Sequence, residues 1–579
     1  MKQVTRLSML SLAFVIAAIA LVIGAVGSAA AATCTDSWDG GASTLSWQDA
    51  LNWSTNVVPG AADNACLGTT ANVTTAADVT IKNLNQSAGS LTINGGTFSL
   101  TDAVNSSSAT NLTLSGGAIA GAATLSTAGA MTWSGGEMMG TGTTAVASGG
   151  VLTLNGASNK YLGRTVSVLS GGNLIETGTG SIGTTSNGTP TINVAGTYDV
   201  QTDVGVFVQN IAGQMNVLSG GVFKKSAGTG TSGFDISVDN DGSVQALSGT
   251  LSMTRGSGVG NSSTGSFSAT AGHTLQLGGD TQNMSGTASV SGAGVIQQTS
   301  GTTTFAGTTW NVTGSTNEIN AGLINFNTAA TTKDGVENGN VGGSATYTIT
   351  GNYSWQSGEM FGTGTTAVAS AGVLSLNGGS NKYLGRTLSV LSGGSLVQID
   401  AGSIGTTSNG TPTINVAGTY DVQTDVGVFV QNTAGQMNVL SGGVFKKSAG
   451  TGTSGFDISV DNDGSVQALS GMLSMTRGSG VGNSSTGSFS ATAGHTLQLG
   501  GDTQNMSGTA SVSGAGVIQQ TSGTTTFAGT TWNVTGSTNE VNAGLINFNT
   551  AATTKDGVEN GNVGGSATYT ITGNYSWQS

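Results

Sequence analysis

A short motif that ends in two glycines recurs at short, nearly constant intervals and limits what this chain can fold into. Residues 91–96 are Leu-Thr-Ile-Asn-Gly-Gly, residues 112–117 are Leu-Thr-Leu-Ser-Gly-Gly, and residues 131–136 are Met-Thr-Trp-Ser-Gly-Gly. Each motif alternates apolar with polar side chains, as a half-buried strand does, and then turns at glycine. Residues 168–172 and 217–221, both Val-Leu-Ser-Gly-Gly, continue the pattern less regularly. Repetition about every 20 residues is typical of the coils of a β-solenoid.

The composition agrees with many short strands joined by tight turns. Gly contributes 97 of the 579 residues and Pro only 3, while charged residues make up 7%. Typical domains have about a quarter charged residues. We expect an all-β parallel β-helix with coils of about 20 residues, in which inward Val, Leu and Ile stack and Gly forms the positive-φ corners. A string of immunoglobulin-like sandwiches is the alternative, although the Pro-rich turns and linkers of such domains are missing.

A much longer repeat, which we call the long repeat, contains these coils. Residues 133–354 recur as residues 355–576, so each position is offset by 355 − 133 = 222 in the numbering. The two copies differ at 16 positions. One variable patch, residues 176–179 against 398–401, predicts an exposed loop. Residues 577–579 repeat the start of a copy, so we expect a truncated third copy and therefore a fragment of a longer protein.

Residues 1–32 have the pattern of a secretory signal peptide. Lys2 and Arg6 precede the apolar stretch 7–26, and residues 28–32 are Ser-Ala-Ala-Ala-Ala. We expect cleavage after Ala32, export, and an extracellular or cell-surface location without membrane insertion afterwards. An uncleaved anchor is the alternative, because about 20 apolar residues can span a bilayer.

The chain is acidic, with a net charge of −13 that becomes −15 when Lys2 and Arg6 leave with the leader. Its Lys and Arg residues are few and scattered. The sequence therefore offers no basic surface for nucleic acid and no polybasic patch for an anionic membrane, and we expect neither partner.

Cys34 and Cys66 are the only cysteines. In an oxidising compartment we expect them to form a disulfide, which would close a loop of about 32 residues and stabilise it by roughly 3 kcal/mol. Two buried thiols are the alternative. A zinc site is not expected, because neither cysteine has a neighbouring Cys or His.

Three of the eight tryptophans, Trp38, Trp47 and Trp53, lie close together near the start of the mature chain. We expect residues 33–88 to form a Trp-rich capping segment, since large rings can cover the open end of a solenoid. The first coils would then occupy residues 89–132. The alternative role for the three indoles is stacking against glycans on exposed ring faces.

The same segment has the pattern Trp…Trp-x-Asp-x-x-Asn-Trp…Pro-x-x-x-Asp, which runs from Trp38 to Asp63. With the Gly-x-Leu-x-Leu-x-Gly-Gly coils, it resembles bacterial secreted surface proteins with autotransporter-passenger-like or adhesin-like β-helix repeats. The resemblance covers essentially the whole mature chain. It implies a right-handed parallel β-helix outside the cell with an adhesive or surface-coat role. The sequence departs from that family at its end, where no translocator barrel or anchor is visible.

Residues that could support catalysis are sparse. A glycosidase needs two carboxylates across the scissile bond, and a β-helix lyase needs several aspartates and a basic residue. The chain has no Asp-Asp pair, and Arg164 and Arg255 stand alone in the sequence. His273 lies beside a predicted strand, where we expect a polar turn residue. We therefore expect no enzyme, no catalytic residue and no cofactor.

The strongest acidic cluster contains Asp239 and Asp241 and recurs as Asp461 and Asp463. Asp-x-Asp-Gly makes these aspartates weak candidates for calcium ligands. The bidentate Glu expected later in such a loop is replaced by Ser248. The Asn-Asp-Gly sequence also forms ordinary turns, and we expect a coil corner here.

Duplication favours a surface over an active site, because catalysis needs one constellation whereas weak multivalent binding strengthens with copy number. We expect a non-catalytic exported surface protein, an adhesin-like or structural β-helix rod that presents a repeated Ser/Thr/Asn-rich surface. Its expected partners are extracellular glycans, surfaces or like chains associating through open strand edges. The alternatives are a carbohydrate-binding or carbohydrate-active β-helix protein of the lyase or hydrolase kind, an ice- or mineral-binding solenoid, and a pure spacer for a missing C-terminal domain.

Overall fold

The computed structural model describes residues 33–578, apart from the side chains at positions 313, 315, 535 and 537. Its only helical element in this range is a 3₁₀ turn, η1 (Ala50–Asn52), and the remainder is strands and turns. In the same range, no helix has the length and apolar character needed to cross a membrane. The predicted signal peptide, residues 1–32, lies outside the described residues. The predicted all-β class is confirmed.

The described part of the chain forms two compact units, unit 1 up to residue 276 and unit 2 from residue 277. The division falls inside the first copy of the long repeat. It does not coincide with the domain boundaries expected after residues 88, 132 and 354, which stay predictions from the sequence.

The Gly-Gly motifs stack on one another at the start of unit 1. In β6 (Ser90–Leu100), β7 (Ser107–Gly121) and β8 (Leu125–Trp133), Leu91 pairs with Leu112 and Leu112 with Met131. These pairs are separated by 112 − 91 = 21 and 131 − 112 = 19 in the numbering. The predicted coil period is therefore confirmed, and the pairing is parallel, as a β-solenoid requires.

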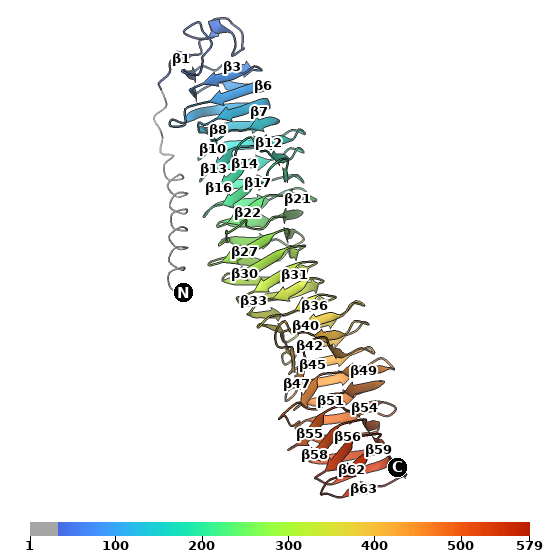
Figure 1. The fold of residues 1–579 in the computed structure, drawn as a ribbon. Helices are drawn as coiled ribbons and strands as arrows, with labels where there is room; N and C mark the ends of the chain where they lie inside the picture. The colour runs from blue at the N-terminus through green and yellow to red at the C-terminus, as the bar shows by residue number, and fades with distance from the viewer. Residues whose placement is uncertain (1–32, 579) are drawn as a thin grey trace, which may run out of the picture. The chain divides into compact units, whose positions relative to one another are not determined.

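Later coils of unit 1 each have three strands, which form three faces of stacked parallel strands (Figure 1). Face 1 contains β10 (Thr143–Val146), β13 (Thr165–Val168), β16 (Thr191–Val194), β19 (Gln214–Val217) and β22 (Ser237–Asn240). Face 2 contains β11 (Val151–Leu154), β14 (Asn173–Glu176), β17 (Thr197–Val200), β20 (Val222–Lys225), β23 (Ser243–Ala246) and β25 (Ser266–Ala269). Face 3 contains β9 (Gly136–Met138), β12 (Lys160–Leu162), β15 (Ile182–Thr184), β18 (Val206–Val208), β21 (Thr231–Phe234) and β24 (Thr250–Met253).

Unit 2 repeats the three faces with strands of the second copy. Its face 1 contains β38 (Thr365–Val368), β41 (Thr387–Val390), β44 (Thr413–Val416), β47 (Gln436–Val439) and β50 (Ser459–Asn462). Its face 2 contains β39 (Val373–Leu376), β42 (Ser395–Gln398), β45 (Thr419–Val422), β48 (Val444–Lys447), β51 (Ser465–Ala468) and β53 (Ser488–Ala491). Its face 3 contains β37 (Glu359–Met360), β40 (Lys382–Leu384), β43 (Ile404–Thr406), β46 (Val428–Val430), β49 (Thr453–Phe456) and β52 (Met472–Met475).

Side chains alternate between the core and the surface along each strand. In β13, Val166 and Val168 are buried, whereas Thr165 and Ser167 face outward. The register places Val166 beside Ile192 of the next coil. Such columns remove apolar area from water, which is the main stabilising contribution in a fold of this kind. The parallel pairing within each unit excludes the alternative of immunoglobulin-like sandwiches, whose sheets are antiparallel.

The predicted glycine corners are present where strands of face 1 turn into face 2. Gly171 and Gly220 have φ values of 79° and 82°. A Cβ at Gly220 would meet no described atom within 4 Å. The backbone conformation, and not a lack of space, therefore favours glycine at this corner.

Candidate functional site

The predicted Trp-rich cluster is present, and its indoles are buried. Trp47 and Trp53 are fully buried and Trp38 is 4% exposed. The rings meet edge to face, with centroids 5.3 Å apart for Trp38 and Trp53 and 4.6 Å apart for Trp47 and Trp53. Trp47 also contacts Phe98 of β6 at 5.2 Å. The cluster packs onto the first coils, as expected of a cap, and buries the indole faces on which a sugar would have to stack.

Parallel stacking begins within the predicted capping segment. β1 (Asp36–Ser37) pairs with β2 (Asn64–Leu67), and β2 pairs with β5 (Asn83–Gln86). The predicted disulfide between Cys34 and Cys66 is present and ties the start of this segment to β2. The cap is therefore a modified first coil.

The polar residues of the N-terminal motif hold this loop in shape. The amide of buried Asn52 donates to the carbonyl oxygens of Thr44 and Ser46, and its Oδ1 accepts from the backbone of Ala42. The carboxylate of Asp49 accepts from the backbone nitrogen of Leu51, at the start of η1. Because these groups are occupied within the loop, the motif has a structural role.

The candidate calcium residues lie at the end of face 1. Ser263 and Thr264 donate to Asp239 and Asp241 respectively, at 3.4 Å and 2.5 Å. Burial, and secondly the charge of Asp241, raise the pKa of Asp239 to about 6. Among residues 33–578, no group of three or more His, Cys, Asp or Glu side chains could hold a metal ion. The two carboxylates on their own form an incomplete ligand set for calcium, which takes six to eight oxygens.

The basic residues of the Lys-Tyr-Leu-Gly-Arg motif in β12 and the turn after it are largely internal. Fully buried Lys160 donates to the carbonyl oxygen of Gly180 at 3.2 Å. Fully buried Arg164 donates to the carbonyl oxygens of Ala123 and Gly142, and burial lowers its pKa to about 10. These cations satisfy backbone oxygens at the turns and are not available to a substrate.

The structure corrects two sequence-based expectations. The patch 176–179 is not wholly an exposed loop, because Glu176 and its counterpart Gln398 are fully buried at the ends of β14 and β42. Arg255 does not stand alone, since its Nε donates to Oδ1 of Asp235 at 2.7 Å. His273 lies in the turn before the next strand, where its backbone nitrogen donates to Thr270.

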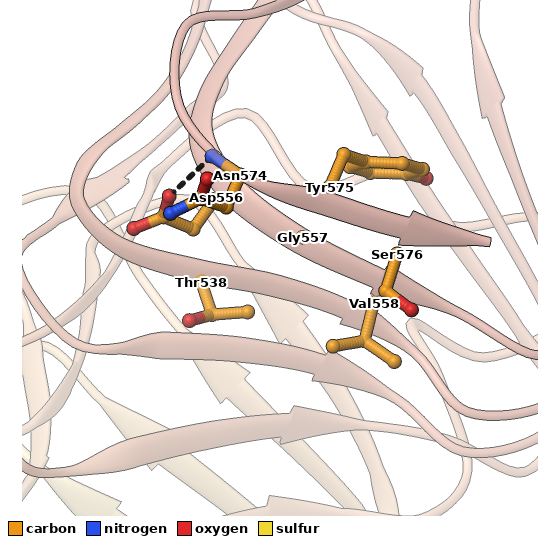
Figure 2. A pocket seen from close by; sticks show the side chains of 7 residues that line it. All are labelled: Thr538, Asp556, Gly557, Val558, Asn574, Tyr575 and Ser576. Atoms are coloured by element: carbon orange, nitrogen blue, oxygen red, sulfur yellow. Dashed lines mark hydrogen bonds between the residues drawn. The ribbon is translucent and has the colours of Figure 1, made fainter.

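A hollow lies on the last described coil of unit 2 (Figure 2). In it the backbone nitrogen of Asn574 donates to Asp556 at 2.7 Å, and the lining residues are Thr538, Asp556, Gly557, Val558, Asn574, Tyr575 and Ser576. One copy earlier, Tyr353 is 1% exposed and pairs with Leu374 of the next coil. The hollow therefore forms because no described coil covers β64 (Tyr575–Trp577). The equivalent position one copy earlier is covered by the next coil, so the hollow is not a repeated feature of the surface.

A row of polar side chains lies on the outer side of face 1 of unit 1. We call it the polar ladder and define it as Ser167, Asn193, Asn216 and Asp239. The four residues are neighbours on successive strands. The amide of Asn216 donates to Oδ1 of Asn193 at 2.8 Å, and Asn193 donates to Ser167 at 3.5 Å. Unit 2 repeats the ladder with Ser389, Asn415, Asn438 and Asp461.

Face 3 carries an arrangement that the sequence reasoning missed. Tyr161, Gly183 and Phe207 are neighbours in register on β12, β15 and β18. The side chains of Tyr161 and Phe207 are half-buried, and Gly183 between them is buried. A Cβ at Gly183 would lie 2.7 Å from Cζ of Phe207 and 3.1 Å from Cδ1 of Tyr161. Both rings therefore lean over this glycine from either side, and both are partly exposed. We call Tyr161, Gly183 and Phe207 the aromatic platform.

Carboxylates border the aromatic platform at both ends. Glu137 of β9 is the neighbour of Tyr161, and its Oε1 accepts from Thr185 at 2.7 Å and from Asn187 at 2.8 Å. At the other end, Asp235 follows β21 directly, and its backbone nitrogen donates to Val206. Asp235 therefore lies beside Phe207 on the next coil.

Unit 2 contains the same platform. Tyr383, Gly405 and Phe429 are neighbours in register, and a Cβ at Gly405 would lie 2.6 Å from Cζ of Phe429. Glu359 borders it and accepts from Thr407 and Asn409.

Comparison with known protein families, with curated proteins and with solved structures finds no match to this chain.

Proposed function

We propose that the chain is a non-catalytic exported surface protein whose β-helix serves an adhesin-like or structural role outside the cell. The observation that supports this most strongly is the repetition of an outward surface. The polar ladder of face 1 recurs in the second copy with the same hydrogen bond, which joins Asn438 to Asn415 at 2.8 Å. Repetition of one surface suits multivalent contact.

The basic side chains that catalysis could use are bonded within the protein, which supports a non-catalytic role. Buried Lys160 and Arg164 are bonded to backbone oxygens, and Arg255 is paired with Asp235. A glycosidase needs two carboxylates facing a substrate across a cleft. Within the described range, the hollow at the end of unit 2 is lined by a single carboxylate, that of Asp556. The two carboxylates at the ends of the aromatic platform are already bonded within the protein, Glu137 to Thr185 and Asn187, and Asp235 to Arg255.

The disulfide between Cys34 and Cys66 supports export, because such bonds persist mainly in oxidising compartments. It agrees with the signal peptide expected from the sequence. Mass spectrometry of the mature protein recovered from culture medium or the cell surface tests this part, and it should find Thr33 as the first residue.

Binding and turnover should be measured together on the purified chain. We expect saturable binding to cells or glycan-coated surfaces, with no release of reducing or unsaturated ends from polysaccharides. Release of such ends would favour the carbohydrate-active alternative. Absence of binding to every surface, with the β-sheet signal intact in circular dichroism, would favour the spacer.

A further inference from the structure

We propose that the aromatic platform of each copy is a binding site for a neutral glycan. This inference rests on the proposed surface role and names a ligand class and a site for it. The site in unit 1 is formed by Tyr161, Gly183 and Phe207 with Glu137 and Asp235 at its ends, and unit 2 holds the equivalent site.

The aromatic platform presents partly exposed ring surface. Tyr161 and Phe207 are partly exposed on a face where neighbouring outward residues are small or polar. Gly183 lets the two rings converge, because a side chain there would occupy the space that Cζ of Phe207 fills. Aromatic faces carry negative potential and attract the positive edges of C–H groups. A pyranose presents such a face of C–H groups, so it can lie flat on the two rings.

The border of the aromatic platform is polar. A pyranose also carries hydroxyl groups around its edge, and these need acceptors when the sugar leaves water. Glu137 accepts two hydrogen bonds, and an ionised carboxylate has about four acceptor positions. Hydrogen bonds to a charged acceptor are stronger than neutral ones. The carboxylate of Asp235 is 45% exposed at the opposite end.

The carboxylates of the aromatic platform and the strand pairing around it disfavour anionic ligands and strand-forming peptides. Carboxylates border the platform at both ends, and Arg255 is already paired with Asp235. Nucleic acids and acidic polysaccharides would bring further negative charge to a chain with a net charge of −13. A peptide that adds a strand needs a free sheet edge, whereas β15 pairs with strands on both sides. A neutral glycan meets none of these obstacles.

The test is calorimetric titration of the purified chain with neutral oligosaccharides. The probes are cellohexaose, xylohexaose, chitohexaose and maltohexaose, with hexagalacturonate as an acidic comparison. We expect at least one neutral probe to bind two sites per chain and to bind more tightly than hexagalacturonate. Tyr161→Ala should leave one site with an unchanged dissociation constant, and so should Tyr383→Ala. The double variant should lose at least tenfold in affinity.

Two further variants separate ring stacking from folding. Gly183→Ala with Gly405→Ala keeps all four rings but displaces them, and should weaken binding severalfold. Tyr161→Phe with Tyr383→Phe keeps the ring surface and should retain binding. Val259→Ala with Val481→Ala, at exposed apolar positions outside the platform, is the matched control and should change nothing. Circular dichroism establishes that each variant is folded.

The proposal is overturned if no neutral probe binds the folded chain, or if the double tyrosine variant binds as well as the parent. It is also overturned if hexagalacturonate is the preferred ligand. If the chain still adheres to cells while the platform variants adhere equally well, the platform is excluded and the surface role stands. If the chain adheres to nothing, the proposed function itself fails.

Discussion

The phenolic hydroxyl of Tyr198 donates a 2.9 Å hydrogen bond to Oε2 of Glu176, and both side chains are fully buried. Burial raises the pKa of Glu176 to about 7, although the hydrogen bond from Tyr198 and the charges of Lys160 and Lys225 act in the opposite direction. The second copy has Gln398 in this place, and Tyr420 donates to it at 2.9 Å. The repeat thus contains a natural pair that differs in one titratable group.

The amide of Gln398 indicates which groups a proton on the Glu176 carboxyl could contact. Its Nε2 donates to the carbonyl oxygens of Gly402 and Gly427, at 3.2 Å and 3.5 Å. Among the described residues, Oε1 of Glu176 has no hydrogen-bond partner. A protonated Glu176 gains a donor that an ionised one lacks, which agrees with its raised pKa.

Stability of the coil around Glu176 should therefore fall as the pH rises from about 4.5 to about 7. Below 4.5, the ordinary pKa of the group, both the folded and unfolded states are protonated and the stabilisation is complete. Between the two values, the unfolded chain has released its proton while the folded chain keeps it. The loss amounts to roughly 3 kcal/mol and does not grow further above pH 7.

Hydrogen exchange resolved by peptide measures this effect, after correction for the intrinsic pH dependence of exchange. Protection of β14 should decrease over this pH range, whereas protection of β42, which contains Gln398, should not. The variant Glu176→Gln should make β14 behave like β42. Equal pH dependence of the two strands in the parent chain would contradict the assignment.

Gly335 in unit 2 lies against a buried aromatic ring that leaves no room for a side chain. Gly335 lies in β33 (Ala330–Glu337), and a Cβ there would lie 2.2 Å from Cε2 of buried Tyr353. Gly335→Ala should destabilise unit 2 by about 1–3 kcal/mol, because the core has no room for the added methyl group. Thermal unfolding followed by circular dichroism measures the change.

Gly455 of β49 provides the control within the same unit. A Cβ at Gly455 would meet no described atom within 4 Å, and its φ is not positive. Gly455→Ala should be neutral or stabilising by up to about 1 kcal/mol, since alanine restricts the unfolded chain. Equal destabilisation by the two substitutions would show that the contact with Tyr353 is not the cause.

Reduction of the disulfide should loosen the cap selectively. Cys34 and Cys66 have a sequence separation of 32, and opening a loop of this length costs about 3 kcal/mol of local stability. Hydrogen exchange in residues 34–66 should accelerate on reduction, and the double variant Cys34→Ser with Cys66→Ser should match it. Strands of unit 2 should be unaffected. Unchanged exchange in residues 34–66 would mean that the Trp cluster alone holds the cap.

Much of the fold follows from short-range sequence patterns. The Gly-Gly motifs predict the stacked strands because each motif contains both the alternation and the corner. The same alternation could have placed Glu176, since Leu174 is buried on the same strand and only Ile175 separates the two. Interpreting sequence variation as exposure gave the wrong result there, because a buried Glu and a buried Gln can fill the same space.

The aromatic platform could not be derived in this way. It depends on register across two coils of different length, since the offsets in the numbering are 183 − 161 = 22 and 207 − 183 = 24. A constant period of about 20 residues would place Tyr161 beside neither Gly183 nor Phe207. The turns that absorb the extra residues have no simple sequence signature, so only the structure brings the three residues together.

We propose that the long repeat presents one binding surface twice. This proposal is tested most directly by the dissociation rate of the chain from a target surface coated at high and at low density. On the dense coating both copies can engage, and we predict dissociation at least tenfold slower than on the sparse coating, as effective concentration requires. Equal dissociation rates at the two densities would contradict the claim, because a chain that binds through one site does not respond to target spacing.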